Sequence, residues 1–526
     1  GQDRNLQDMP KTITLTLYPK QAADEATYLD IAARRAGIST HNIALARILK
    51  RSVDARGQSV KVNLTIELFV DGEKEPEQVP FDYPDVSHKD EVVIVGGGPA
   101  GLFAALRLIE LGYCPVILER GKEVAERKKD IAALNRNGAL DPDSNYAFGE
   151  GGAGTFSDGK LFTRSKKRGD YNKALQTLVF HGASPEILYE AHPHIGTDKL
   201  PAIMTAIRRT ITGSGGKVIF NARVTDLLIR GGKIKGVLCG AERIEGIAVV
   251  LATGHSASDI YQVLHSGGVL VEAKPFAMGV RIEHPQQLID GIQYHGAGRE
   301  YLPAASYTLT AQVGGRGVYS FCMCPGGFIV PALTDPAESV VNGMSPSQRN
   351  SRWANSGIVT EIRLGDFEHL RDEFGELAGL EYRRRFEHAA RANGGPGQTA
   401  PAQRVTDFIA GCQSPSLPPA SYVPGLESSR LDKWMPELIS SHIRHGLLAF
   451  GNRMRGFVTD QAQLIGVESR TSSPVRIPRD ALTLAHPQYA NLYPAGEGAG
   501  YAGGIISAAL DGERIAEAIA RAGNSH

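Results

Sequence analysis

The sequence predicts an α/β protein. A Rossmann-like domain with a parallel sheet is interrupted by a mixed α+β domain and preceded by a small α+β module. Three observations lead to this prediction. An apolar strand runs directly into a glycine-rich turn and a helix at residues 91–106, "EVVIVGGGPAGLFAAL". A second strand, glycine loop and helix follow much later, at 491–519. After residue 259 the chain alternates short strands with two longer helical stretches, 370–393 and 431–450.

The first 85 residues predict the small module. Residues 11–18 alternate apolar and polar side chains as a strand does, and residues 21–37 have helical spacing. Residues 41–56 are predicted to form a second helix and residues 59–72 another strand. The segment 74–90 contains three prolines and many charges, which is typical of a linker.

The glycine turn that follows is the strongest local signal. Gly96, Gly98 and Gly101 match G-x-G-x-x-G, and a second strand, "CPVILER", ends in Glu119. In such a turn the first glycine permits the tight bend, the second lets the backbone approach a pyrophosphate, and the third allows the helix to pack on the strand. Glu119 can accept hydrogen bonds from an unphosphorylated ribose. These features predict a dinucleotide at the helix N-terminus.

The elements after the glycine turn complete the first part of this domain. Residues 198–211 form an amphipathic helix with Asp198 as the expected N-cap. A hairpin is predicted at 224–239, with Gly231-Gly232 at its turn, and a buried strand at 246–254. The predicted organisation is an accessory module at 1–85, a nucleotide domain at 90–258, a substrate or cap domain at 259–480, and the rest of the nucleotide domain at 481–526.

Composition limits the classes of partner. The chain has 526 residues with 57 basic and 57 acidic side chains, which argues against nucleic acid or an anionic membrane as the main partner. No apolar run reaches the ~18–20 residues of a membrane span, and the first residues have no signal-peptide core. The cysteines are odd in number and mostly scattered: Cys114, Cys239, Cys322, Cys324 and Cys412. We therefore expect a cytoplasmic protein with a small-molecule substrate and no metal site.

Two further segments indicate which dinucleotide is bound. "LATGHSAS" (251–258) follows a strand, and "NLYPAGEGAGYAGGIIS" (491–507) places a glycine loop and an acid before a helix of small residues. Over 91–258 and 480–522 the chain resembles the FAD superfamily typified by glutathione reductase. This resemblance implies FAD as cofactor, with Glu497 on its ribitol, where the family more often has aspartate. It also implies that the helix opened by Gly503 and Gly504 faces the flavin.

A glycine-rich loop, "YAFGEGGAGTFSDGKLFTR" (146–164), supplies more candidates. Thr155, Ser157, Asp158 and Lys160 could reach phosphate, ribitol or flavin, although a flexible surface lid is the alternative. With "FAMGVRIEHP" (276–285) and "YSFCMCPGG" (319–327), this loop makes the chain similar to FAD-dependent dehydrogenases of unknown substrate that are akin to geranylgeranyl reductases. That similarity implies a flavin enzyme without specifying its substrate.

The full set of expected cofactor contacts comes from the segments just described. They are Gly96, Gly98, Pro99, Ala100, Gly101, Glu119, Arg120, Gly154, Thr155, Ser157, Asp158, Lys160, Val224, Ala252, Thr253, Gly254, Gly496, Glu497, Gly503, Gly504 and Ile505.

Four residues are candidates for catalysis. Cys322 and Cys324 lie in an apparent strand and would project to one face, where they could relay electrons or act as small core residues. Lys160 could reach the flavin edge. Arg470, in "GVESRTSSPVRIPRD" (466–480), could hold an anionic substrate group or form an interdomain salt bridge. "NSRWANSG" (350–357) supplies polar groups or, as we favour, a turn.

The predicted function is that of a FAD-dependent oxidoreductase, a dehydrogenase or reductase that transfers hydride between flavin N5 and a small substrate, for which an apolar molecule is one option. The alternatives are a FAD-dependent monooxygenase, a non-catalytic flavin-bound protein that docks a partner through its N-terminal module, and an RNA-modifying flavoprotein. Only one Rossmann fingerprint occurs, so NAD(P)H, if it is the reductant, would bind transiently at the flavin face. A ferredoxin-like or quinone donor is the other option.

Overall fold

The computed structural model describes residues 10–73, 75, 80–164, 169–296 and 298–524. At its centre is a five-stranded parallel sheet in the order β22-β10-β4-β5-β6. Its strands are β4 (Glu91–Val95), β5 (Cys114–Leu118), β6 (Lys217–Ile219), β10 (Ala248–Leu251) and β22 (Leu492–Pro494). The two distant glycine-rich segments therefore meet in one Rossmann-like sheet, which confirms the predicted fold class.

Helices and a small sheet cover the two faces of this sheet, because its central strands are apolar on both sides. One face carries α3 (Pro99–Glu110), α6 (Leu200–Gly213) and α15 (Ile505–Gly523). The other carries α7 (Ser258–Ser266) and a three-stranded sheet. That sheet consists of β7 (Asp226–Arg230), β8 (Lys233–Cys239) and β9 (Glu242–Glu245), so the hairpin predicted at 224–239 is confirmed.

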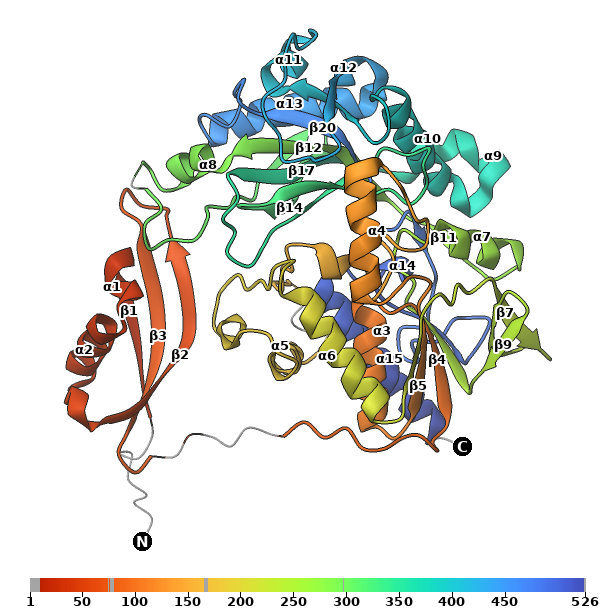
Figure 1. Ribbon diagram of the computed structural model, residues 1–526, viewed down its shortest axis with the longest axis horizontal. Coiled ribbons are helices and arrows are strands. Elements are labelled where there is room, and N and C mark those ends of the chain that lie inside the picture. The colour runs from red at the N-terminus through yellow and green to blue at the C-terminus, as the bar shows by residue number, and fades with distance from the viewer. Residues whose placement is uncertain (1–9, 74, 76–79, 165–168, 297, 525–526) are drawn as a thin grey trace.

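A seven-stranded sheet forms the second large layer, at the top of Figure 1. Its order is β13-β14-β17-β12-β20-β18-β19, and α13 (Glu437–Arg453) packs on it. Its strands are β12 (Phe276–Pro285), β13 (Thr310–Val313), β14 (Arg316–Cys324), β17 (Trp353–Ile362), β18 (Ala400–Arg404), β19 (Leu426–Ser428) and β20 (Gln463–Glu468). Residues 353–357 belong to β17, so the turn predicted for 350–357 is wrong over that stretch.

The remaining elements connect these layers. In the half built on the parallel sheet they are α4 (Val124–Asn137), α5 (Tyr171–Phe180) and α14 (Gly496–Ala499). In the inserted half they are β11 (Glu272–Ala273), α8 (Gln286–Gln293), β15 (Phe328–Pro331), β16 (Val341–Met344), α9 (Arg371–Phe374), α10 (Ala378–Ala392), α11 (Val405–Ala410), α12 (Leu431–Trp434) and β21 (Val475–Arg476). Among the described residues no helix is long and apolar enough to cross a bilayer.

The N-terminal module is a three-stranded antiparallel sheet, β1 (Lys11–Leu17), β3 (Lys61–Val70) and β2 (Ile43–Asp54), covered by α1 (Pro19–Ala23) and α2 (Glu25–Ala36). The helix predicted for 41–56 is wrong, because residues 43–54 form β2. Two register shifts in the pairing of β2 with β3, at Ile43/Leu45 and Ile48/Lys50, interrupt the alternation of side chains. This irregular spacing resembles a helical pattern.

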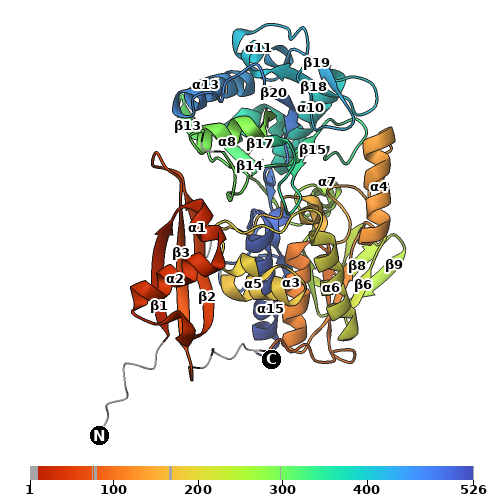
Figure 2. The same cartoon turned by 60° about the vertical axis from the view of Figure 1, so that its left-hand side comes forward.

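Figures 1 and 2 show this module beside the rest of the molecule. The module contacts the rest of the protein through β2 and the loop that follows β2. Arg51 N–H donates to Tyr189 O at 2.9 Å, and Ala191 N–H donates to Arg51 O at 2.9 Å. His295 Nε2 lies 2.8 Å from Ala55 O. Residues 74 and 76–79 of the predicted linker lie outside the described residues, and the predicted boundaries at 85, 258 and 480 stay a prediction.

Asp198 does not cap α6 as predicted. The helix begins at Leu200 with Lys199 at its N-cap and no capping side chain. The Asp198 carboxylate instead accepts hydrogen bonds from the backbone N–H and the hydroxyl of Ser347, at 2.6 and 2.7 Å. It therefore ties the segment directly before α6 to the inserted domain, and a local sequence pattern could not have shown this.

Glu513 lies buried on α15, and burial raises its pKa to about 7 from the ordinary value of 4.5. The folded state therefore holds this proton more tightly than the unfolded state. The resulting stability is complete below about pH 4.5 and is lost as the pH rises through 7.

Glu513→Gln is therefore expected to leave stability unchanged near pH 4 and to raise it at pH 8, by at most about 3 kcal/mol. The measurement is the denaturation midpoint of both proteins as a function of pH. Glu126→Gln is the control, because Glu126 lies on α4 with its side chain 51% exposed. Identical pH profiles for wild type and Glu513→Gln would contradict this prediction.

Candidate functional site

The three glycines of the turn between β4 and α3 have different surroundings. A Cβ on Gly96, which has φ +105°, would lie 2.1 Å from Ala252 O, and a Cβ on Gly101 would lie 2.1 Å from Gly96 O. These two positions need glycine because backbone packs against backbone. A Cβ on Gly98 would meet only Gly152 Cα, at 3.8 Å. Gly98 is therefore free of internal crowding and borders an open space.

That space is a cavity of about 390 Å³, here called the cradle, enclosed by the turn, the loop 147–160 and the first residues of α3 and α15. Most of the predicted cofactor contacts line it. They are Gly96, Gly98, Pro99, Ala100, Glu119, Arg120, Gly154, Ser157, Asp158, Lys160, Val224, Ala252, Thr253, Gly254, Gly496, Glu497, Gly503, Gly504 and Ile505. The N-termini of two helices thus face one cavity, where free N–H groups favour an anion.

Two predicted contacts do not line the cradle. Gly101 is buried against Gly96, so it supports the packing of α3 without facing the cavity. The Thr155 side chain is fully buried, and its hydroxyl donates to Glu150 O at 2.7 Å. Neither residue borders the cavity in this arrangement of the loop, so a direct contact of either with a ligand there is disfavoured and stays an untested prediction.

Glu119 lies in the cradle wall but is already engaged by backbone groups. Its carboxylate accepts hydrogen bonds from the N–H groups of Gly97, Gly121 and Gly149, at 2.9, 2.9 and 3.1 Å. A carboxylate has about four acceptor positions, so one is left for a ribose hydroxyl. The neighbouring Arg120 is paired with Asp259 at 2.6 Å.

Glu497 holds the start of α15. One carboxylate oxygen lies 3.0 Å from His255 Nδ1, and the other accepts a hydrogen bond from the N–H of Gly504. Burial acts to raise the pKa of Glu497, but His255 and the Gly504 N–H outweigh it, so the pKa is lowered. The acid predicted from the glycine loop is thus ionised and organises the helix N-terminus that borders the cradle.

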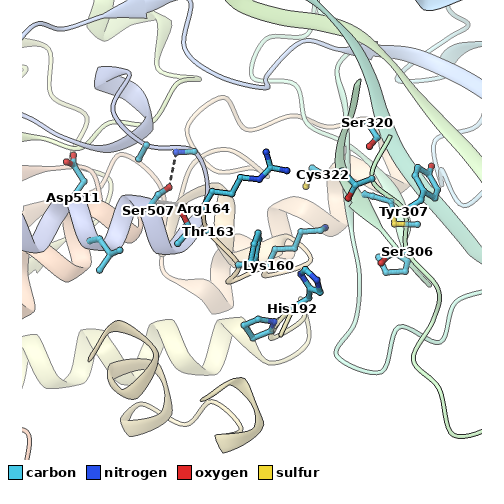
Figure 3. A pocket seen from close by; sticks show the side chains of 18 of the residues that line it. Lys160, Thr163, Arg164, His192, Ser306, Tyr307, Ser320, Cys322, Ser507 and Asp511 are labelled. Carbon is cyan, nitrogen blue, oxygen red and sulfur yellow. Dashed lines mark hydrogen bonds between the residues drawn. The ribbon is translucent and has the colours of Figure 1, made fainter. Parts of the chain in front are cut away.

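A second and larger cavity, of about 1200 Å³, adjoins the cradle. This cleft, shown in Figure 3, lies between the loop 160–164, the segment 306–325 and residues 500–514. Lys160, Phe162, Cys322 and Gly503 line both cavities. A ligand in the cradle and one in the cleft would therefore approach each other at these four residues.

Lys160 is held at this junction by a buried acid. Asp158 is 1% exposed and lies 3.2 Å from Lys160 Nζ, while Arg349 donates to it from Nε and Nη2 at 3.1 and 2.6 Å. Burial opposes the charge on Lys160, but Asp158 and the cysteine sulfurs outweigh it and raise its pKa. Burial likewise opposes the charge on Asp158, and the two cations lower its pKa. Lys160 is therefore a fixed cation where the cavities meet.

The two cysteines occupy different positions. The pairing of β14 with β17 shifts between Phe321 and Cys324, and Cys322 has φ +47°, so the regular alternation assumed for the pair is interrupted. Cys322 faces both cavities, whereas Cys324 is buried and lines neither. The Cys324 thiol lies 3.9 Å from Lys160 Nζ and 3.6 Å from Arg281 Nη2.

Beneath Cys322 lies a fully buried ion pair. Arg281 Nη1 is 2.5 Å from Glu468 Oε2, and Nη2 donates to the carbonyl oxygen of Cys322 at 2.5 Å. Arg281 Nε donates to Asn355 Oδ1 at 2.7 Å. Burial raises the pKa of Glu468 to about 7 against the charge of Arg281. The pair fixes the backbone at Cys322 and adds a second cation to its surroundings.

Cys322 is expected to be the most reactive thiol of the chain. A hydrogen bond with the Cys324 thiol lowers the pKa of Cys322, and Lys160 and Arg281 add to this against the effect of burial. The exposed Cys412 has a raised pKa, from desolvation and the nearby Asp407. Because the thiolate is the nucleophile, iodoacetamide should modify Cys322 about tenfold or more faster than Cys412 near pH 7.

The measurement is time-resolved alkylation followed by peptide mass spectrometry, with and without bound cofactor. Lys160→Met should slow the reaction of Cys322 and leave that of Cys412 unchanged. Faster labelling of Cys412 in both states of the protein would contradict this assignment.

Arg470 does not form an interdomain salt bridge. Its guanidinium is 4% exposed and contacts Glu387 at 2.7 Å and Glu338 at 3.0 Å, and all three residues lie within 259–480. It borders the cradle. Because two carboxylates already occupy its donors, the geometry disfavours the role predicted for it, of gripping an anionic substrate.

Several cavity residues escaped the sequence analysis. Phe148, His255, Phe321 and Asn342 line the cradle. His255 directly follows Gly254, so the strand-to-glycine signal at 246–254 could have included it. Phe321 directly precedes Cys322 in the segment 319–327, so that segment could have included it, whereas no local pattern marks Asn342.

Comparison with known proteins identifies the relatives of this chain. A family described as "FAD-dependent protein, C-terminal domain-like" matches residues 275–471, and a domain of unknown function matches residues 9–69. An uncharacterized protein of Clostridium beijerinckii is 39% identical over 509 residues, which cover 92% of this chain and 94% of that protein. This chain belongs to the family of that protein.

Several solved structures have a partial likeness to this chain. A geranylgeranyl bacteriochlorophyll reductase-like protein from Thermoplasma acidophilum has a TM-score of 0.35 at 12% identity, over 83% of this chain and 79% of its own. L-proline dehydrogenase from P. horikoshii has a TM-score of 0.32 at 13% identity, over 84% and 94%. CtdE, crystallised with FAD, has a TM-score of 0.33 at 12% identity, over 82% and 84%.

Proposed function

We propose that this protein is a FAD-dependent oxidoreductase in which the cradle holds FAD and the cleft receives the molecule that exchanges electrons with it. The observation that carries this proposal is the junction between the two cavities at Lys160, Phe162, Cys322 and Gly503. The cradle has the features of a dinucleotide site, and at these four residues it adjoins a cleft large enough for an organic substrate.

The residues present fit FAD. The Cα of Gly98 faces the cradle with no side chain to fill it, and the N-termini of α3 and α15 point their free N–H groups into the same space. The first helix would hold the pyrophosphate, with one acceptor position of Glu119 left for the ribose. Glu497 would lie by the ribitol. We likewise propose that the other predicted residues that line the cradle contact FAD.

FAD, when bound, supplies an acceptor or donor of an electron pair. The protein contributes fixed charges around it. The N-terminus of α15 favours negative charge at the end of the cradle near Gly503 and Gly504. Lys160, kept protonated by Asp158, can donate a hydrogen bond or a proton to a ligand at the junction. Phe162 and Cys322 complete the boundary between cofactor and substrate. The narrower kinship with geranylgeranyl reductases stays a prediction.

The direct test is the cofactor itself. The purified protein should be yellow and should release FAD, not FMN, on denaturation. A substrate in the cleft should perturb or bleach the flavin spectrum under anaerobic conditions. Colourless protein that fails to take up added FAD would refute the proposal. Reoxidation of the reduced enzyme by oxygen, measured with and without substrate, separates a dehydrogenase from a monooxygenase.

A further inference from the structure

The cleft carries a concentration of positive charge that the whole chain does not have. The sequence has zero formal net charge. Among the described residues, five basic side chains line the cleft, Lys160, Arg164, Arg349, Arg476 and Arg514, against one acidic side chain, Asp511. A cavity with this balance focuses a positive potential onto whatever enters it.

The carboxylates close to the cleft do not neutralise this charge, because each one serves two cations. Asp511 accepts from Arg479 at 2.6 and 2.9 Å and from the N–H of Gly496 at 2.8 Å, and Arg514 reaches it only at 4.0 Å. Asp158 is likewise shared between Lys160 and Arg349. One positive charge therefore remains at each of these two clusters.

Two further arginines have no acidic partner in the part of the chain that the structure describes. Arg164 is exposed, and Figure 3 shows its side chain extending along the cleft toward Cys322. Arg476 lies over the Tyr501 ring, with its guanidinium carbon 5.4 Å from the ring centroid. Its Nε is buried and finds no acceptor among the described residues. Glu272 is paired with Arg476 across β11 and β21 without forming an ion pair.

We propose that the cleft binds a small molecule that carries at least two anionic groups, carboxylates or phosphates, at separate points along its length. This inference rests on the proposed function and defines the chemical class of the molecule that meets the flavin. In Figure 3 the cleft extends from Ser507 and Asp511 on α15 to Ser320 and Cys322 on β14, with Arg164 and Lys160 between them. The surplus cations are thus spread along the cleft.

The energetics favour such a ligand over an apolar one. A wholly apolar molecule would remove water from the arginine and lysine side chains without forming hydrogen bonds to replace it, which costs free energy. Anionic groups replace that water with charge-assisted hydrogen bonds, which the planar guanidinium forms in pairs.

The test is isothermal titration of the protein as purified, with six probes: citrate, pyrophosphate, NADPH, acetate, a neutral long-chain alcohol and an RNA oligonucleotide. We expect at least one of the multiply charged probes to bind, with an affinity that falls as salt is raised. Acetate, a single anion, should bind at least about tenfold more weakly. Preference for citrate would identify a carboxylate substrate. Preference for NADPH over citrate, with bleaching of the flavin, would identify the reductant as the anion.

Two variants locate the binding. Arg164→Gln and Arg476→Gln should each lower the affinity of the protein for the anion about tenfold. Both variants should keep the FAD content and melting temperature of the wild type. Arg34→Gln is the matched control, because Arg34 is an exposed arginine on α2, outside the cleft. Its affinity for the anion should equal that of the wild type.

Three outcomes would overturn the proposal: equal anion affinity in the wild type and both variants, binding of the neutral alcohol alone, or binding of an RNA oligonucleotide without any small anion. Failure of the proposed function is a separate result. If the protein takes up no FAD but still binds the anion through Arg164 and Arg476, the ligand class stands and the oxidoreductase assignment falls.

Discussion

Gly98→Val is expected to leave the protein folded while removing its ability to hold FAD. Residue 98 has φ −81° and ψ −173°, which valine adopts without strain, and its Cβ would meet only Gly152 Cα at 3.8 Å. The rest of the side chain would occupy the space in the cradle that the pyrophosphate needs. Overpacking of about 3 kcal/mol corresponds to roughly 100-fold weaker binding.

The measurement is FAD content after purification, and the dissociation constant of the apoprotein for added FAD. Stability should be compared between the apo forms, because loss of the ligand lowers the melting temperature by itself. Gly291→Val on α8 is the matched control, since a Cβ there meets nothing within 4 Å and the residue lies outside both cavities. Wild-type FAD content in Gly98→Val would place the cofactor elsewhere.

Arg281→Met is expected to cause the largest loss of stability, about 3–5 kcal/mol, because it leaves Glu468 buried without its partner. Both side chains are 0% exposed. The loss should be larger at pH 8 than at pH 5, since the pKa of Glu468 is already raised to about 7 and protonation removes the unpaired charge. The measurement is the chemical denaturation midpoint of the apoprotein at the two pH values.

The double variant Arg281→Met/Glu468→Leu should recover most of that stability, because no buried charge is then left. Arg34→Met is the control for the loss of an arginine at the surface. Arg34 and Asp30 form an exposed pair, with side chains 74% and 47% exposed, so the change should stay within about 0.5 kcal/mol. A single variant as stable as the wild type would show that the buried pair contributes nothing.

The cradle was largely predictable from the sequence, because its determinants are local. A strand, a glycine turn and a helix follow one another at 91–106 and again at 491–519, and the backbone geometry of each turn is set by its own glycines. Residues such as Gly98 and Gly504 therefore border the cavity as predicted. Thr155 does not border the cavity, because its hydroxyl donates a hydrogen bond to Glu150 O. The conformation of the folded loop sets this contact, and the sequence pattern does not show it.

The cleft could not be predicted, because it is assembled from segments hundreds of residues apart. Lys160, Cys322 and Arg476 meet there only after the inserted sheet has docked on the Rossmann-like domain. The same holds for the pairing of Arg470 with Glu338 and Glu387, which disfavours the predicted role of Arg470 as a substrate contact. The net charge of a sequence does not show where its charged side chains lie in the folded protein. A chain with zero formal net charge can therefore contain a cationic cavity.

By itself, the sequence determined the α/β class, the position of the glycine turn after the first strand of the parallel sheet, and the acid at Glu497, since each depends on the order of neighbouring residues. The tertiary structure alone decided that residues 43–54 form a strand, that Asp198 binds Ser347 without capping α6, and that the surplus cations line one cleft. The physical reason is that strand pairing, buried hydrogen bonds and ion pairs join residues by distance in space, which the spacing along the chain does not specify.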